Sequence, residues 1–192
     1  TLSGDLLWKR ELLFADGHSI GDLTGDGNLE VVYTSMFNPP ITAVDSDGNT
    51  LWEYIHEGGG AFHPPTMVDL NGDGNLEIVA QSGGDDLQLV CLDNTGRLKW
   101  SVPTKQSSTG WPPTIGDLTG DGNLEIVTGS TGEISVWSHT GEPLWSFPTK
   151  VDDTSQILIA DIDNNGRNDI IFMEWNSANF YENQGSNCLL YT

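Results

Sequence analysis

The 192-residue chain has little positive charge, little cysteine and no long apolar run. Lysine and arginine total 7 against 28 acidic residues, which gives a formal net charge of −21. A surface this acidic repels phosphate backbones and anionic lipid head groups, so we expect neither nucleic acid nor a membrane surface as partner. No stretch of about 20 apolar residues is present, so the sequence predicts no membrane-spanning helix.

The short motifs that mark common enzyme classes are also missing. The sequence has no G-x-S-x-G elbow, no HExxH, no P-loop and no Cys/His metal cluster. The four histidines do not recur at a common position, and a scattered histidine is more often a surface or packing residue than a catalyst. Sustained helical periodicity is absent as well, so we expect an all-β chain.

One acidic phrase, in contrast, is present four times. Oxygen-bearing side chains stand at positions 1, 3, 5 and 9, and a glycine stands at position 6, where the backbone must turn sharply. Such a loop can wrap a hard cation, and Ca²⁺ suits it because calcium takes roughly six to eight oxygen ligands in irregular geometry. Three carboxylates within nine residues would repel one another without a cation. We call the copies acidic loops one to four: DLTGDGNLE at 22–30, DLNGDGNLE at 69–77, DLTGDGNLE at 117–125 and DIDNNGRND at 161–169.

The loops recur at spacings of 47, 48 and 44 residues, and other positions recur with them. A glycine stands four residues before a tryptophan in each unit, and β-branched runs follow each loop, so each unit predicts four short strands. Four-stranded antiparallel units of this period are typical of β-propeller blades. The glycine and tryptophan pairs are Gly4 and Trp8, Gly48 and Trp52, Gly96 and Trp100, and Gly141 and Trp145, with a degenerate fifth pair, Gly185 and Leu189.

The phrase and its setting between two strands resemble the FG-GAP/VCBS repeats of calcium-binding, integrin-α-like β-propellers. The resemblance covers nearly the whole chain. It implies side-chain ligands at positions 1, 3, 5 and 9, a backbone carbonyl ligand at position 7, and up to four Ca²⁺ that tie the first two strands of each blade together. The implied ligands are Asp22, Thr24, Asp26, Asn28 and Glu30; Asp69, Asn71, Asp73, Asn75 and Glu77; Asp117, Thr119, Asp121, Asn123 and Glu125; and Asp161, Asp163, Asn165, Arg167 and Asp169.

Two departures from the family pattern affect these loops. Position 3 of the first and third loops is threonine, whose hydroxyl is a weaker ligand than an amide or carboxylate oxygen. In the fourth loop one carboxylate has moved from position 5 to position 3.

We expect a single β-propeller, or part of one, over residues 1–192. The approximate blades are residues 13–57, 58–104, 105–149 and 150–192, and residues 1–12 form an extra outer strand. The chain opens at Thr1 without a methionine or a signal-like stretch, which predicts a processed or excised piece. Three interpretations of the extra strand stay open: the chain is part of a larger propeller, the strand is donated to a neighbouring subunit, or it replaces the weak strand around 188–192.

Function is expected at the end of the blades opposite the acidic loops, where the sequence varies between repeats. The candidate ligand-binding residues there are Phe62, His63, Trp111 and His18. Exposed aromatic rings can stack on sugars or anchor a protein, and the alternative is that they fill the central channel as packing.

The sequence therefore favours an extracellular or cell-surface binding or adhesion module without catalysis, whose partner is a glycan or a surface protein. Millimolar extracellular calcium would fill loops of ordinary affinity. One alternative is a structural subunit of a surface assembly or filament that self-associates through the N-terminal strand. Another is a polysaccharide-active enzyme, because DGHSIGD at 16–22 resembles a segment of a calcium-dependent polysaccharide lyase propeller. Cys91 and Cys188 lie about two repeats apart, so we expect a packed thiol at Cys91 and no internal disulfide.

Overall fold

The fold is all-β. A computed structural model describes residues 4–11, 15–35, 40–56, 63–82, 87–105, 111–149, 156–174, 177–183 and 188–191, and these residues form sixteen strands. Within this part of the chain, no helix has the length and hydropathy that crossing a bilayer requires.

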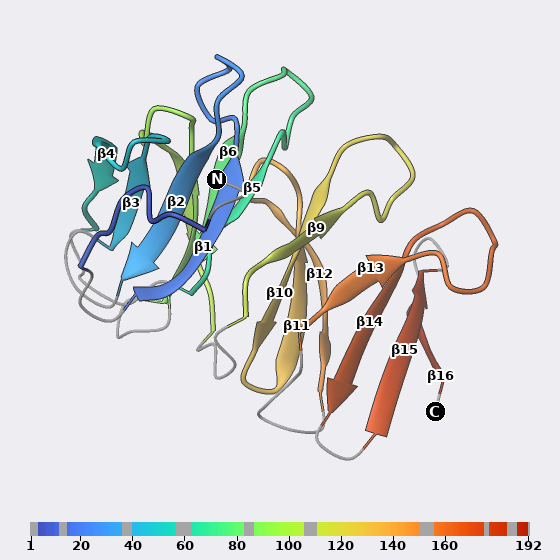
Figure 1. Cartoon of the computed structure of the whole chain (residues 1–192). Coiled ribbons are helices and arrows are strands. Elements are labelled where there is room, and N and C mark those ends of the chain that lie inside the picture. Colours follow the sequence, from blue (N-terminus) through green and yellow to red (C-terminus); the bar gives the residue numbers. More distant parts are fainter. Residues whose placement is uncertain are drawn as a thin grey trace.

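The strands form four separate sheets, and each sheet is an antiparallel meander of four strands that are consecutive in the sequence (Figure 1). We call these sheets blades one to four. Blade one contains β1 (Ala15–Gly21), β2 (Glu30–Ser35), β3 (Ile41–Val44) and β4 (Thr50–Tyr54). Blade two contains β5 (Thr66–Val68), β6 (Glu77–Gln81), β7 (Gln88–Leu92) and β8 (Leu98–Pro103). Blade three contains β9 (Thr114–Gly116), β10 (Glu125–Ser130), β11 (Glu133–Trp137) and β12 (Pro143–Pro148). Blade four contains β13 (Leu158–Ala160), β14 (Asp169–Glu174), β15 (Ser177–Asn183) and β16 (Cys188–Tyr191).

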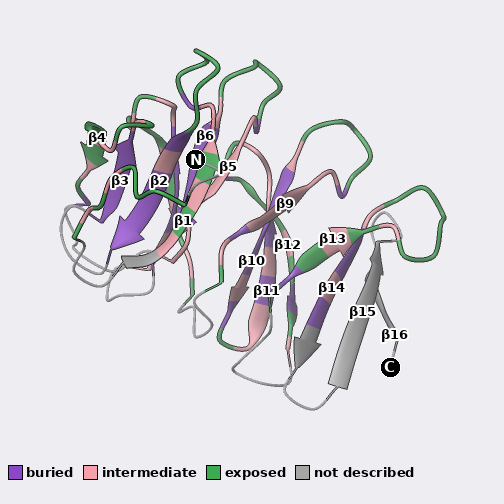
Figure 2. Cartoon of the chain, in the orientation of Figure 1, coloured by how far each residue is buried: buried purple, intermediate pink, exposed green. Residues whose placement is uncertain are grey.

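Among the described side chains, β2, β3, β6, β7 and β10 are the most deeply buried strands (Figure 2). Every residue of β3 and of β6 is buried, whereas the fourth strands β4 and β8 alternate between exposed and half-buried residues. These strands are rich in valine, isoleucine and leucine, residues that suit strands buried on both faces. A period-2 alternation of exposure is clear on the outermost strands β4 and β8.

Three hydrophobic clusters lie between successive blades. Val32 of blade one and Ile78 of blade two belong to the first cluster, and Val79 and Ile126 belong to the second, which joins blades two and three. Phe147 and Phe172 pack together at the junction of blades three and four, with ring centroids 5.9 Å apart. The core is thus divided among the junctions, so each blade is stabilised by its neighbours.

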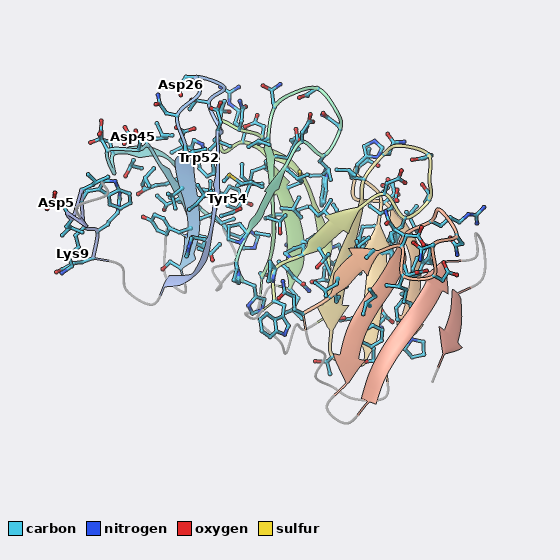
Figure 3. The ribbon with its side chains drawn as sticks, turned by 45° about the vertical axis from the view of Figure 1, so that its right-hand side comes forward. Asp5, Lys9, Asp26, Asp45, Trp52 and Tyr54 are labelled. Atoms are coloured by element: carbon cyan, nitrogen blue, oxygen red, sulfur yellow. The ribbon has the colours of Figure 1, made fainter. Side chains whose placement is uncertain are left out.

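The four blades form an open arc. The innermost strands contact one another from β1 to β5 and from β9 to β13, and blades one and four stand at opposite ends of the arc in both views (Figures 1 and 3). The architecture is that of β-propeller blades that do not close into a ring.

Residues 4–11 lie along blade one, on its side away from blade two, where Asp5 and Lys9 are seen at the edge of the molecule (Figure 3). The sequence predicts an outer strand here, and no strand pairing is assigned to residues 4–11. Their tryptophan is nevertheless anchored, because the Trp8 indole packs over Gly48 and its Nε1 donates to the Ser46 carbonyl at 2.9 Å. The Arg10 guanidinium lies 5.9 Å from the centroid of the Tyr33 ring.

The same tryptophan contact links the blades. Trp52 of blade one packs over Gly96 of blade two and donates to the Asn94 carbonyl at 3.0 Å. Trp100 of blade two packs over Gly141 of blade three in the same way. Trp8, Trp52 and Trp100 therefore each contact the glycine turn of the blade that follows and not the glycine four residues before them.

Cys91 lies in β7 and is fully buried as a free thiol. Burial raises the pKa of this thiol to about 12, so the group is an unreactive packing residue. The Cys188 side chain and the Trp175 residue lie outside the described part of the structure.

Candidate metal centres

The four acidic loops connect the first and second strands of each blade, and they lie along one edge of the arc (Figure 1). Position 6 is a glycine with positive φ in every loop, at Gly27, Gly74, Gly122 and Gly166. Position 4 also has positive φ and is glycine in the first three loops. In the fourth loop this position is Asn164, with φ 60°, a residue type that tolerates the left-handed region better than most.

The aspartate at position 1 organises each loop by accepting backbone hydrogen bonds. Asp22 accepts from the amides of Gly25 at 2.8 Å and of Gly27 at 3.0 Å. The equivalent Asp161 accepts from Gly166 at 2.8 Å. The backbone amides thus hold the carboxylate of position 1 in place while it remains near the surface.

The acid at position 9 is the most deeply buried acidic residue of each loop. Glu30 is 2% exposed, Glu125 is 3% exposed and Asp169 is 1% exposed. Glu30 Oε2 accepts from the amide of Leu23 at 2.8 Å, and the same bond is repeated from position 2 of the other three loops. Burial raises the pKa of Glu125, and the nearby Asp121 and Asp117 charges act in the same direction.

The aspartate at position 5 is held in its charged form. The backbone amide of the asparagine at position 7 donates to the carboxylates of Asp26, Asp73 and Asp121 at 2.8 Å, and this bond holds their pKa below the ordinary value. Ionised carboxylates at exposed positions are the form that a hard cation binds.

The fourth loop brings three carboxylates together. One oxygen each of Asp161, Asp163 and Asp169 lies within 4.8 Å of the others, and among the described residues this is the one such group of three acidic, histidine or cysteine side chains. The amide oxygen of Asn165 adds a further hard donor, although in this structure it accepts from the Arg167 amide at 2.8 Å. An all-oxygen donor set of this charge fits Ca²⁺ and not a soft metal.

One residue near the loops was missed in the sequence. Lys99 Nζ forms an ion pair with Glu77 Oε1 at 2.7 Å, and this hydrogen bond raises the pKa of Lys99. The residue before the repeat tryptophan is leucine at Leu7, Leu51 and Leu144, whereas it is Lys99 in blade two. This departure from the repeat was the feature of the sequence that could have indicated the ion pair. A cation in the second loop would therefore compete with Lys99 for the carboxylate of Glu77.

Two of the candidate ligand residues, His63 and Trp111, lie at the end of the blades opposite the acidic loops. Trp111 precedes β9 and is 44% exposed, His63 precedes β5 and is half-buried, and His18 is exposed within β1. The backbone amide of His63 donates to the Gln81 carbonyl at 2.9 Å. Phe62 lies outside the described residues.

Comparisons with solved structures place this fold among β-propellers. The Vibrio cholerae biofilm matrix protein Bap1 is 22% identical, with a TM-score of 0.66 over 90% of this chain and 29% of that protein. An Agrocybe aegerita lectin that recognises non-reducing terminal N-acetylglucosamine is 18% identical, with a TM-score of 0.56 over 91% of this chain and 51% of the lectin. BamB from Moraxella catarrhalis is 13% identical, with a TM-score of 0.59 over 92% of this chain and 52% of BamB. The chain thus spans about half of these proteins or less.

The family comparison agrees with the loop geometry. Comparison of the sequence with curated proteins finds no match. The FG-GAP-like repeat model matches residues 22–80, 69–128 and 117–172, each match running from one acidic loop into the unit that follows it. These matches span most of the chain, which therefore belongs to the FG-GAP-like repeat family.

Proposed function

We propose that the protein is a calcium-stabilised extracellular binding module without catalytic activity, and that it holds a glycan or a protein on the end opposite the acidic loops. The observation that carries the calcium assignment is the cluster of Asp161, Asp163 and Asp169. The other three loops repeat its backbone hydrogen bonds with oxygen donors in the same places. When bound, the ion supplies charge neutralisation, which allows the carboxylates of each loop to stay close together.

Calcium would join the first and second strands of each blade, because positions 1 and 9 of each loop stand at the ends of those strands. Binding to the folded chain alone raises stability by mass action, about 2.7 kcal/mol for one site at a hundredfold excess over Kd. Millimolar extracellular calcium provides such an excess for sites of ordinary affinity. The biofilm matrix location of Bap1 is consistent with an extracellular setting.

Removal of calcium tests the metal assignment. We expect the melting temperature to fall strongly when excess EGTA is added to protein in millimolar CaCl₂. The matched control is the same titration with MgCl₂ in place of CaCl₂, which keeps ionic strength constant and should leave the melting temperature close to that in EGTA. An identical melting curve with and without EGTA would refute the calcium proposal.

Trp111 is the main reason to place a binding surface at this end of the blades. This indole is 44% exposed beside Pro112 and Pro113, on an end of the blades whose segments differ between repeats. A large exposed ring next to rigid proline backbone is a suitable platform for a sugar face or a protein anchor.

A glycan array, followed by calorimetry on any hit, tests this surface. We expect Trp111→Ala to weaken binding at least tenfold, since loss of a central aromatic anchor costs roughly 2 kcal/mol or more. Leu144→Ala is the matched control, because Leu144 is 43% exposed on the outer strand β12, and we expect it to bind like the parent chain. Equal binding by the two variants would remove Trp111 from the site.

A further inference from the structure

We propose that the two ends of the arc are the two halves of one blade-to-blade junction, and that a second copy of the chain docks there head to tail. The leading face of a blade is the side toward the preceding blade, and the trailing face is the side toward the next one. This docking is independent of the ligand proposed above.

The trailing face is defined by a leucine at position 2 of each acidic loop. Leu23, Leu70 and Leu118 are 1%, 2% and 1% exposed. Each belongs to the hydrophobic cluster between its own blade and the next one. A following blade therefore buries this position completely.

The leading face is defined by apolar residues beside the same loop. Met67 and Leu76 of blade two point at Gly21 of blade one, where a Cβ would lie 3.4 and 2.9 Å from their terminal carbons. Ile159 of blade four lies against Gly116 of blade three in the same manner. The leading face thus inserts apolar side chains against the innermost strand of its predecessor.

At the end of the arc the trailing face of blade four is uncovered. Ile162 is the counterpart of the three buried leucines, yet it is 46% exposed. Leu158 is 55% exposed, whereas its counterparts Thr66 and Thr114 donate to carbonyls of the next blade, at 2.6 and 2.8 Å. Blade four therefore presents an apolar trailing face with no blade against it among the described residues.

At the other end, the inner half of the leading face of blade one is uncovered as well. Ile20 is 57% exposed and Leu29 is 58% exposed. Their counterparts in blade two are Met67 and Leu76, which pack into the first hydrophobic cluster. The chain thus carries one uncovered leading face and one uncovered trailing face, each the counterpart of a face that is buried at the internal junctions.

The outer half of the leading face of blade one is already covered by residues 4–11. Trp8 contacts Gly48 as Trp52 contacts Gly96, so this segment occupies the place of the fourth strand of a preceding blade. Gly4 has φ 77° and no atom within 4 Å of a Cβ built on it, whereas the equivalent glycines of blades one to three lie beneath a tryptophan. The missing tryptophan would come from the blade that precedes the docking blade in the second copy.

Blade four of a second copy can be the blade that precedes blade one when residues 4–11 of the first copy replace its fourth strand, β16. β16 has Leu189 where the other fourth strands carry tryptophan, and residues 4–11 have both Gly4 and Trp8. After the exchange, Gly4 takes the repeat position of Gly185, so the second copy's Trp145 lies over it. The exchange thus continues the series of tryptophan and glycine contacts from blade three of the second copy, through the exchanged strand, to blade one of the first copy.

A second copy fits better than the chain's own blade four, because blades one and four stand at opposite ends of the arc (Figures 1 and 3). Complementary faces on one molecule produce head-to-tail association, which closes into a ring when the rotation permits. The chain aligns with 51% of the lectin and 52% of BamB, so two copies have about the length of one such propeller chain.

Sedimentation equilibrium in calcium, from micromolar to submillimolar protein, tests the proposal. We expect twice the monomer mass for the parent chain. We expect the monomer mass for Ile20→Gln with Leu29→Gln, and also for Leu158→Gln with Ile162→Gln. An equimolar mixture of these two variants should recover a dimer, because one intact junction remains between them. Its dissociation constant should exceed that of the parent, which has two junctions.

The control variant combines Leu98→Gln with Leu144→Gln. These leucines are 49% and 43% exposed on the fourth strands β8 and β12, away from both end faces, and the parent mass should be retained. All substituted residues are already exposed, so melting in calcium should change little. A monomeric parent chain overturns the proposal, and so does a dimer that only one of the end-face variants disrupts or a mixture that stays monomeric.

Removal of β16 tests the strand exchange separately. A chain without Cys188–Tyr191 should dimerise at least as well as the parent, because residues 4–11 no longer compete with β16. Loss of the dimer on this deletion, with the melting temperature in calcium unchanged, would show that β16 itself is needed and would overturn the exchange.

Discussion

At the residue scale, the contact of Trp52 with Gly96 requires a residue without a side chain for two separate reasons. Gly96 has φ +80°, and a Cβ at this position would lie 2.5 Å from the Trp52 ring. The backbone conformation and the ring therefore each exclude a side chain. The two costs can be separated, because another glycine with similar φ has open space around it.

We predict that Gly96→Ala destabilises the fold by about 2 to 4 kcal/mol, the sum of left-handed backbone strain and overpacking against the indole. Gly132→Ala is the matched control, since Gly132 has φ +73° and no atom within 4 Å of its Cβ position. This variant should lose only the backbone part, roughly 1 to 2 kcal/mol. Urea unfolding at constant calcium measures both. Equal losses would mean that the Trp52 ring moves aside without cost.

At the element scale, the four acidic loops share one hydrogen-bond pattern and differ in where their charge lies. The first three loops place acids at positions 1, 5 and 9, and the fourth places them at 1, 3 and 9. Only the latter arrangement, among the described residues, brings three carboxylates within 4.8 Å. The fourth loop should therefore depend on calcium more than the others.

We predict that Asp163→Asn raises the melting temperature in EGTA and lowers calcium affinity. The change removes a charge that faces two carboxylates, each pair costing about 1 kcal/mol in a water-like dielectric. It also gives the fourth loop the asparagine that Asn71 provides in the second. Differential scanning fluorimetry in EGTA and calorimetric calcium titration measure the two effects.

Asp47→Asn controls for the change in net charge, because Asp47 lies in the exposed turn between β3 and β4 and outside all four acidic loops. It should leave calcium affinity unchanged. A lower melting temperature for Asp163→Asn in EGTA would contradict the repulsion argument.

Much at this scale could be predicted from the sequence, and the reasons are physical. The β-branched runs and the glycine turns repeat with the same spacing, which is why the sequence predicts an all-β fold of four-stranded antiparallel blades. The structure confirms this prediction. The assignment of ligands to Asp22, Asp69 and their equivalents stays a prediction. The pairing of Lys99 with Glu77 could not be read from the repeat, because it rests on a single departure from it. The contact of Trp52 with Gly96 depends on how far the fourth strand overlaps the next blade, which spacing alone does not reveal.

At the scale of the whole molecule, the net charge of −21 opposes the compact state. The acidic loops collect much of this charge along one edge of the arc, where like charges repel over several ångströms. Calcium and ordinary salt should relieve this repulsion by different routes, since calcium binds in the loops and monovalent ions only screen.

We predict that NaCl raises the melting temperature in EGTA and changes it much less in millimolar calcium. The Debye length falls from about 30 Å at 0.01 M to about 10 Å at 0.1 M, so screening reaches the spacing between charges within this range. Melting curves at several NaCl concentrations, with and without EGTA, provide the comparison, and sodium sulfate at matched ionic strength controls for anion effects. A melting temperature in EGTA that does not respond to NaCl would show that charge repulsion contributes little.

The overlap of each tryptophan with the following glycine gives the molecule a direction. The joints made by Trp8, Trp52 and Trp100 each reach forward into the next blade, so blades one to three present the same turn to the segment before them. No single repeat then determines how many blades a chain contains. A family built on this joint can lengthen or shorten by whole units of 44 to 48 residues without redesign of the blades that remain.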